Sequence, residues 1–483
     1  MPEYLHPGVY IEEIPRGPRP IEGVPTSTAG FLLAAERGPL QPTRITGDSE
    51  YTRWFGELDH SVRGFFENGG KRLVVCRVVS SSARTSQAKI GDFVLAAMGP
   101  GAWGQRLWVK ITPSSTRDGK DIPVGFRLRV ALFAPGNTPH DCFDGPALMP
   151  KPALVEDHDD LVTEPRSIDH FAKRLGADSA LISLRAGNES ATSPPPVFNG
   201  TLTDGCNGAP LEAADYEPVL AALEQEREVA LVYSPAADEP TQRLLVEHCE
   251  KVKFRFAVLD APRGVAPTTL EPRRHITDSA CAAYYAPWLE IQDSGKSHWV
   301  PPGGHVLGIY ARTDLERGVH QAPANAAVRG ASGLEFSITD RDQEILTPRG
   351  VNAIRAFDGR GIRAWGARTL ASQAEWKYVN VRRQLIYLEH SIDEGTQWVV
   401  FEPNGEPLWA QVRTSVEQFL FAQWRSGAFL GARPEEAFFV RCDRTTMTQN
   451  DIDSGQLICL VGFAPLKPAE FVVLRIGHRL QSS

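Results

Sequence analysis

The chain has 483 residues and a formal net charge of −8, with 42% hydrophobic and 23% charged residues. This length allows roughly two to four domains, and the composition is typical of a globular protein, which excludes wholesale disorder. The acidic balance argues against nucleic acid as the main partner, because binding phosphates needs a basic face. No stretch reaches the ~18 apolar residues of a membrane span, so we expect no direct membrane insertion. The N-terminus lacks the basic and apolar regions of a signal peptide.

The seven cysteines are widely spaced and form no CxxC pair. This spacing predicts neither a zinc site nor a disulfide framework. Most of the cysteines lie in apolar runs, such as LVVCRVV, where cysteine behaves as a small hydrophobic residue. We therefore expect a reducing compartment.

Residues 1–20 are predicted to form an extended arm rather than a domain. Five prolines interrupt them, and proline does not fit a helix interior. Between the prolines lies the β-capable run GVYIEEI. Fully extended, such a segment reaches roughly 65 Å at ~3.3 Å per residue. It is long enough to reach a neighbouring molecule, and an edge strand folded back on its own domain is the alternative.

Residues 21–84 and 201–300 are predicted to be mixed α/β, and residues 85–200 to be a mostly β insertion with a fold of its own. The insertion follows the Ser-rich SSSARTS and ends at the proline-rich SPPPVFNG. In the flanking segments helices alternate with apolar strands, which favours a layered sheet. The expected elements are strands at 29–34, 73–79, 229–233 and 254–259, and helices near 48–55, 216–226 and 240–251.

Residues 301–483 show the most regular pattern. Apolar residues recur at helical spacing over 381–392, a strand WVVFEP is expected next, and a second helix carries residues 412–420. Three strands follow: AFFVRC, QLICLVGFAP and EFVVLRI. The last is apolar at nearly every position, so both of its faces should be covered. It lies either in its own sheet or in the sheet of another molecule.

Three polar segments are candidates for chemistry. SGKS at Ser294–Ser297 is similar to the end of a phosphate-binding loop, but Glu290 stands where that pattern begins with glycine. EDHDD at 156–160 is interpreted as a solvated acidic loop rather than a metal site, because no second ligand group accompanies it. Cys442–Gly455 is interpreted as a long turn with local hydrogen bonds rather than a binding site.

Aromatic residues and arginines gather around Trp365 and Trp376, a composition found on nucleic-acid surfaces and on protein interfaces. In an acidic chain the protein interface is the better interpretation. No serine, zinc or cysteine signature of an enzyme is present in the sequence. We therefore predict no catalytic residues, no metal ligands and no cofactor.

The segments described so far resemble phage tail sheath proteins. The N-terminal YLHPGVYIEEIPRGPRPIEGVPTSTAGFLLAAERGP and the central VPPGGHVLGIYARTDLERGVHQAPANAAVRG are similar to motifs of that family. The same holds for GVNAIRAFDGRGIRAWGARTL and for the run from WVVFEPNGEPLWAQVR to EFVVLRI. The resemblance covers about residues 3–80 and 300–477, and more loosely 205–300; residues 85–200 match nothing reliable.

The resemblance implies an α/β (mixed α+β) multidomain subunit with extended β arms at both ends. Residues 21–84 would form the N-terminal part of the sheath core, 85–200 the outward-facing insertion, 201–300 the middle domain, and 301–483 the C-terminal core domain with a terminal strand at 470–476. The arm and the terminal strand would join the C-terminal sheets of other subunits by β-augmentation. The residues expected in this strand exchange are Tyr4, Val9, Tyr10, Ile11, Glu12, Ile14, Phe471, Val472, Val473, Leu474 and Ile476.

The partners implied are further copies in stacked, hexameric rings, an inner tube protein, baseplate and tail terminator proteins, and a sheath paralogue. The resemblance implies contraction that drives the tube through a target envelope without ATP, in a particle assembled in the cytoplasm of the producing bacterium. Two alternatives remain: a non-contractile tail adaptor or terminator, and an α/β enzyme with an unrecognised site.

Overall fold

The computed structural model describes residues 19–144, 149–187 and 193–470. The chain divides into two units. We call residues 26–316 and 323–379 the central unit. Residues 317–322 and 380 onward, with the segment up to Pro25, form the C-terminal unit. The mixed α/β class expected from the sequence is confirmed. No described helix combines the length and the apolar character that a membrane crossing requires.

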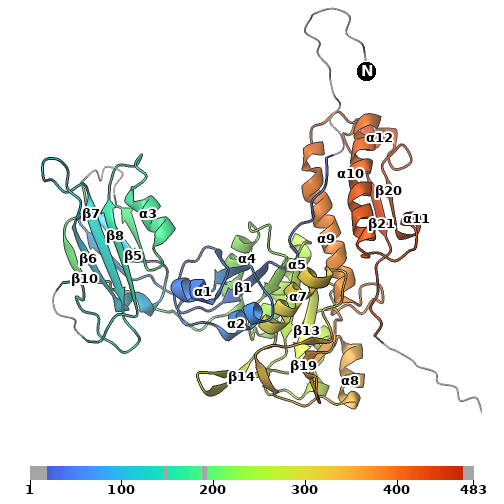
Figure 1. The fold of residues 1–483 in the computed structure, drawn as a ribbon, viewed down its shortest axis with the longest axis horizontal. Coiled ribbons are helices and arrows are strands. Elements are labelled where there is room, and N and C mark those ends of the chain that lie inside the picture. The colour runs from blue at the N-terminus through green and yellow to red at the C-terminus, as the bar shows by residue number, and fades with distance from the viewer. Residues whose placement is uncertain (1–18, 145–148, 188–192, 471–483) are drawn as a thin grey trace, which may run out of the picture. The chain divides into compact units, whose positions relative to one another are not determined.

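A nine-stranded sheet organises the central unit (Figure 1). Its strand order is β16-β19-β18-β13-β12-β11-β1-β3-β2, and the six strands from β18 to β3 are parallel. Parallel strands buried on both faces read as nearly continuous apolar runs, and this is the pattern of AGFLL in β1 and of the first four residues of LVVCR in β3. The strands are β1 Ala29–Leu33, β2 Thr43–Ile45, β3 Leu73–Arg77, β11 Leu231–Tyr233, β12 Phe256–Asp260, β13 Ala282–Ala286, β16 Ala326–Ala327, β18 Val351–Phe357 and β19 Gly361–Ala364.

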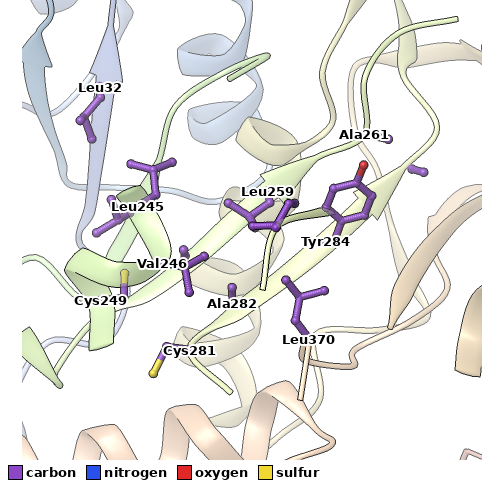
Figure 2. Close-up of a cluster of buried hydrophobic side chains, with 14 of the residues drawn as sticks. Leu32, Leu245, Val246, Cys249, Leu259, Ala261, Cys281, Ala282, Tyr284 and Leu370 are labelled. Atoms are coloured by element: carbon purple, nitrogen blue, oxygen red, sulfur yellow. The ribbon is translucent and has the colours of Figure 1, made fainter. Parts of the chain in front are cut away.

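Helices cover both faces of this sheet. On one face α4 and α5 contribute Leu223, Leu245 and Cys249 to a buried cluster with alternate strand residues, and Figure 2 shows the α5 side chains beside Leu259 and Ala282. On the other face the packing is aromatic and uses α2 and α7. The helices of this unit are α1 Asp48–Phe55, α2 His60–Glu67, α4 Glu217–Leu223, α5 Glu239–Val252, α6 Pro272–His275, α7 Gly303–Arg317 and α8 Asp340–Leu346.

The segment between β3 and α4 contains two sheets, β10-β6-β7-β8 and β4-β5-β9, with one shared core. The segment 156–160 is not the solvated loop expected from its charges, because it lies within a strand. Glu156 is buried there and accepts hydrogen bonds from Ser179 Oγ at 2.6 Å and from Ala180 N at 2.8 Å. The elements are β4 Gln87–Ile90, β5 Phe93–Ala97, β6 Leu107–Pro113, β7 Phe126–Leu132, β8 Leu154–Leu161, α3 Phe171–Asp178, β9 Ile182–Ala186 and β10 Phe198–Thr201.

The C-terminal unit is built on two long helices, α9 Val379–Thr396 and α10 Glu406–Arg425, as the helical spacing predicted. The strand expected at WVVFEP is wrong. Gln397–Val399 is a 3-10 turn that continues α9, and Val400 and Phe401 are exposed rather than paired. The remaining elements are α11 Pro434–Ala437, β20 Phe438–Arg441, α12 Gln449–Asp453 and β21 Leu460–Phe463. The turn expected at Cys442–Gly455 thus contains the short helix α12.

The domain boundaries expected from the sequence differ from those of the structure. β16, β18 and β19 lie beyond residue 300, yet they belong to the same sheet as β1 and β13. Residues 21–25 belong to the C-terminal unit rather than to the segment that follows them. Local patterns do not reveal such divisions, because parallel strands pair across long stretches of chain.

Helices α2 and α7 approach each other closely through glycines. A Cβ at Gly308 would collide with the main-chain oxygen of Phe65, and one at Gly304 with the main chain of Ser61. On an exposed helix, replacing glycine by alanine is stabilising by up to ~1 kcal/mol. At this contact there is no space for a Cβ, so the same replacement should destabilise the protein.

We predict that Gly308→Ala destabilises the central unit by about 1–3 kcal/mol, the usual cost of overpacking. Thermal unfolding measures the change. The matched control is Gly176→Ala in α3, where a Cβ meets nothing within 4 Å; this variant should unfold at an equal or higher temperature. If both variants raised the unfolding temperature equally, α2 and α7 would not be in close contact.

A buried carboxylate connects two strands to the start of α7. Asp260 accepts hydrogen bonds from Tyr233 Oη and from Gly303 N, both at 2.7 Å. Burial raises its pKa to about 7. Between its unfolded pKa of ~4 and this value, the folded state keeps a proton that the unfolded chain has lost. Rising pH across this window therefore weakens the folded state.

We predict that Asp260→Asn removes this pH dependence. Relative to the variant, the wild-type chain should lose up to about 4 kcal/mol of stability between pH 4 and pH 8. Denaturant unfolding at both pH values measures the difference. Asp238→Asn, at the exposed N-cap of α5, is the control. A difference between wild type and Asp260→Asn that does not change with pH would contradict the assignment.

Candidate assembly site

The C-terminal unit carries a sheet of only two strands in the described part of the chain. β20 and β21 are antiparallel, with Phe438 opposite Phe463 and Arg441 opposite Leu460. A two-stranded sheet is marginally stable by itself and needs packing or further strands. Packing on one face is present, because Val440 is buried against the cluster formed by α9 and α10.

The hydrogen-bond phase of the hairpin determines which main-chain groups face outward. Ala464 N donates to Ala437 O at 2.8 Å, so the alternation of antiparallel pairing makes Phe439 and Gly462 a hydrogen-bonded pair. Val440 and Val461 then form a non-hydrogen-bonded pair. Their main-chain N–H and C=O groups point away from the partner strand, toward the two outer edges of the sheet.

The side chains of the hairpin are incompletely covered. Val461 is opposite Val440 and lies on the helix-facing side, yet it is 37% exposed, and Phe463 is also only partly buried. On the other face Phe439 and Leu460 are each 50% exposed. Apolar side chains beside outward-pointing main-chain groups are what a further strand would cover.

The helices position this hairpin. α10 supplies much of the cluster behind the sheet, and Phe419 and Leu420 are among its buried members. The segment after α10 lies beside the end of β21, where Leu430 N donates to Ala464 O at 2.9 Å. Trp424 Nε1 in turn donates to Gly431 O at 3.0 Å. These contacts hold the end of β21 to the segment that follows α10.

The chain that follows the expected N-terminal arm is fixed to α9. Ile21 is buried in the same cluster as Leu388, and Val24 N donates to Ser391 Oγ at 3.1 Å. Gly23 lies against Tyr387 so closely that no Cβ would fit. A segment emerging at residue 19 therefore starts from a fixed point on this unit.

The chain that precedes the expected terminal strand is also attached to this unit. Asn380, near the start of α9, donates through Nδ2 to Leu466 O at 3.0 Å and to His320 O at 2.8 Å. Both terminal segments thus begin on the unit that carries the two-stranded sheet.

The predicted strand-exchange residues themselves lie outside the described residues. These are Tyr4, Val9, Tyr10, Ile11, Glu12 and Ile14 at one end, and Phe471, Val472, Val473, Leu474 and Ile476 at the other. Their roles remain predictions. The sequence predicted β20 and β21 but not their outward-facing valines, because edge positions depend on which strands are neighbours.

The other candidate segments have structural roles. SGKS is the turn of the hairpin between β14 Leu289–Asp293 and β15 Lys296–Val300, with positive φ at Ser294 and Gly295. Trp365 packs against Phe357 in a tilted arrangement, with 4.5 Å between the ring centroids. Among the residues that the structure describes, no three His, Cys, Asp or Glu side chains are grouped as a metal site requires.

Two family models match the chain in succession. The phage tail sheath protein central domain matches residues 209–370, and the phage tail sheath C-terminal domain matches residues 371–478. Together they cover more than half of the 483 residues. The hairpin β20–β21 lies inside the second match.

Curated relatives have low sequence identity to the chain. A tail sheath protein of Vibrio phage KVP40 is 25% identical over 183 residues, which is 37% of this chain and 26% of the relative. A putative prophage major tail sheath protein of Pseudomonas aeruginosa is 24% identical over 232 residues, 44% of this chain and 55% of the relative. The alignments thus span about a quarter to about half of the length of these relatives.

Solved structures share the fold over nearly the whole chain. The sheath of an extracellular contractile injection system, PVC, in its contracted state has a TM-score of 0.62 at 24% identity, and the match covers 100% of this chain and 99% of that one. A sheath tail protein of Listeria innocua has a TM-score of 0.61 at 14% identity, covering 92% and 96%. On the two domain matches and this shared fold, the chain belongs to the phage tail sheath protein family.

Proposed function

We propose that the chain is the subunit of a contractile sheath, which polymerises as stacked rings around an inner tube and contracts to drive that tube through a target envelope. The observation that carries the proposal is the two-stranded sheet β20–β21, with uncovered apolar side chains and outward-facing main-chain groups. The family and the solved sheath structures in the contracted state support it.

Strand addition would link the subunits. The apolar run Phe471–Leu474 of one copy, or the arm Tyr4–Ile14 of another, would pair with β20 or β21 of a neighbour. Main-chain hydrogen bonds supply affinity, and alternate side chains fit the apolar face. Covering Val461 and Leu460 would bury apolar surface worth ~25 cal/mol per Å².

Such links are suited to a sheath that changes shape. Each would join subunits through an extended segment rather than through a broad, fixed interface, so rings would rotate and approach while the strands stay paired. The free energy of contraction would come from better contacts between subunits in the shortened form. This requires no nucleotide, and the SGKS segment is a hairpin turn.

We further propose that the work of the chain is mechanical rather than catalytic. Its partners would be further copies in hexameric rings, the tube, the baseplate, a terminator and a sheath paralogue. The particle would assemble in the cytoplasm of the producing bacterium. The outward-facing role of residues 85–200 and the interface role of Trp365 belong to the same proposal.

Blocking one strand edge tests the proposal. Val461→Pro removes an N–H that points outward, and leaves the hydrogen bonds between β20 and β21 intact because position 461 lies in a non-hydrogen-bonded pair. In negative-stain microscopy we expect the wild-type chain to form ribbed tubes or rods, and the purified variant to fold but to form none. The control, Val461→Thr, keeps the N–H and should polymerise.

A second variant leaves the hairpin untouched. Deleting residues 471–483 removes the proposed donor strand, so the truncated chain should stay small in sedimentation. Polymers of normal length from both Val461→Pro and the truncated chain would contradict strand addition at β21.

A further inference from the structure

Two cysteines lie opposite each other where the hairpin β20–β21 continues. The pairing of the two strands ends at Arg441 opposite Leu460. One step further along the same register places Cys442 opposite Cys459. Both are free thiols, and both belong to the apolar cluster on the helix-facing side of the sheet.

The alternation of hydrogen-bonded and non-hydrogen-bonded pairs along the hairpin favours a disulfide between the two cysteines. Cys442 and Cys459 continue the series of Val440 and Val461, and therefore form a non-hydrogen-bonded pair. In such pairs the Cα atoms are about 4.5 Å apart, within the range of about 4.4–6.8 Å found in disulfides. The two side chains also leave the sheet on the same face.

Neighbouring hydrogen bonds hold the two strand ends together. Thr446 Oγ1 donates to Ile458 O at 2.8 Å, and Asp443 N donates to Thr446 Oγ1 at 3.3 Å. These contacts join the residue after Cys442 to the residue before Cys459. A hydrogen bond from the Cys459 thiol also lowers the pKa of Cys442.

We propose that Cys442 and Cys459 form an intramolecular disulfide when the chain meets a low-molecular-weight disulfide such as oxidised glutathione. One of the two cysteines, as its thiolate, attacks the small disulfide, which forms a mixed disulfide and releases one thiol. The other cysteine, as its thiolate, then attacks the protein sulfur of the mixed disulfide and releases the second thiol. In balance, two protein thiols and one small disulfide give one protein disulfide and two small thiols.

The bond would close the loop that contains α12 and fix the register of β20 and β21. Closing the loop between Cys442 and Cys459 reduces the number of conformations open to the unfolded hairpin. If the chain works as proposed above, the sheet that receives a neighbour's strand would be reduced during assembly in the cytoplasm, and would be locked after release into an oxidising medium. The disulfide itself does not depend on that function.

The test is direct mapping of the bond in the full chain. The wild-type protein is incubated with oxidised or reduced glutathione, digested without reduction and analysed by mass spectrometry. Oxidised glutathione should give a peptide pair joined through Cys442 and Cys459, lighter by two hydrogens than the free thiols. Cys459→Ala should abolish this pair.

Other cysteines of the chain serve as internal controls. Cys206 accepts a hydrogen bond from Arg84 Nε at 3.4 Å, which lowers the pKa of its thiol; its modification by glutathione shows that oxidant was present. Cys249 is enclosed in the nine-stranded core, where burial raises its pKa, and should stay reduced. The proposal is wrong if Cys206 is modified while Cys442 and Cys459 stay free or carry separate glutathiones.

Hydrogen exchange gives a second readout that requires no variant. Oxidation should slow exchange at the amides of β20 and β21 at least tenfold, and the double variant Cys442→Ala, Cys459→Ala should not respond. Equal exchange in the oxidised and reduced wild-type chain would also overturn the proposal. Because a monomer suffices for both readouts, failure here is distinct from failure to polymerise.

Discussion

The structure of the C-terminal unit depends on one constraint: main-chain groups at the edge of a sheet need partners. β20 and β21 satisfy each other on one side only, and their outer sides carry the N–H and C=O groups of Val440 and Val461. On the face away from the helices, Phe439 and Leu460 are each half exposed. A sheet of this kind is either a hazard for aggregation or an acceptor for a specific strand.

The central unit meets the same constraint differently. Its parallel strands are covered on both faces, and antiparallel strands, β2 at one side and β19 and β16 at the other, end the sheet. Glycines allow α7 to lie against α2, and the buried Asp260 accepts a hydrogen bond from Gly303 N at the start of α7. The sheet of the C-terminal unit has two strands in the described part of the chain, and the described ends of both terminal segments contact α9 of that unit. This contrast is the reason why we propose that subunits assemble through the C-terminal unit.

The sequence predicted elements whose pattern is local. The buried strands β1 and β12 appear as apolar runs, and α9 and α10 show helical spacing. Prediction from the sequence failed where the burial of a residue depends on segments that are distant along the chain. Glu156 looked solvated because its donors at Ser179 and Ala180 lie on another segment. The candidate site was predicted in part. The two strands were expected from the sequence, but the edge positions and the facing cysteines follow only from the register of β20 with β21.

The most direct test of strand exchange is an electron cryo-microscopy map of the polymer formed by the purified chain. The account predicts at least one additional strand beside β20 or β21, traceable to residues 1–18 or 471–483 of a different subunit. A polymer in which this sheet keeps two strands with uncovered edges, or in which the added strand belongs to the same chain, would contradict it.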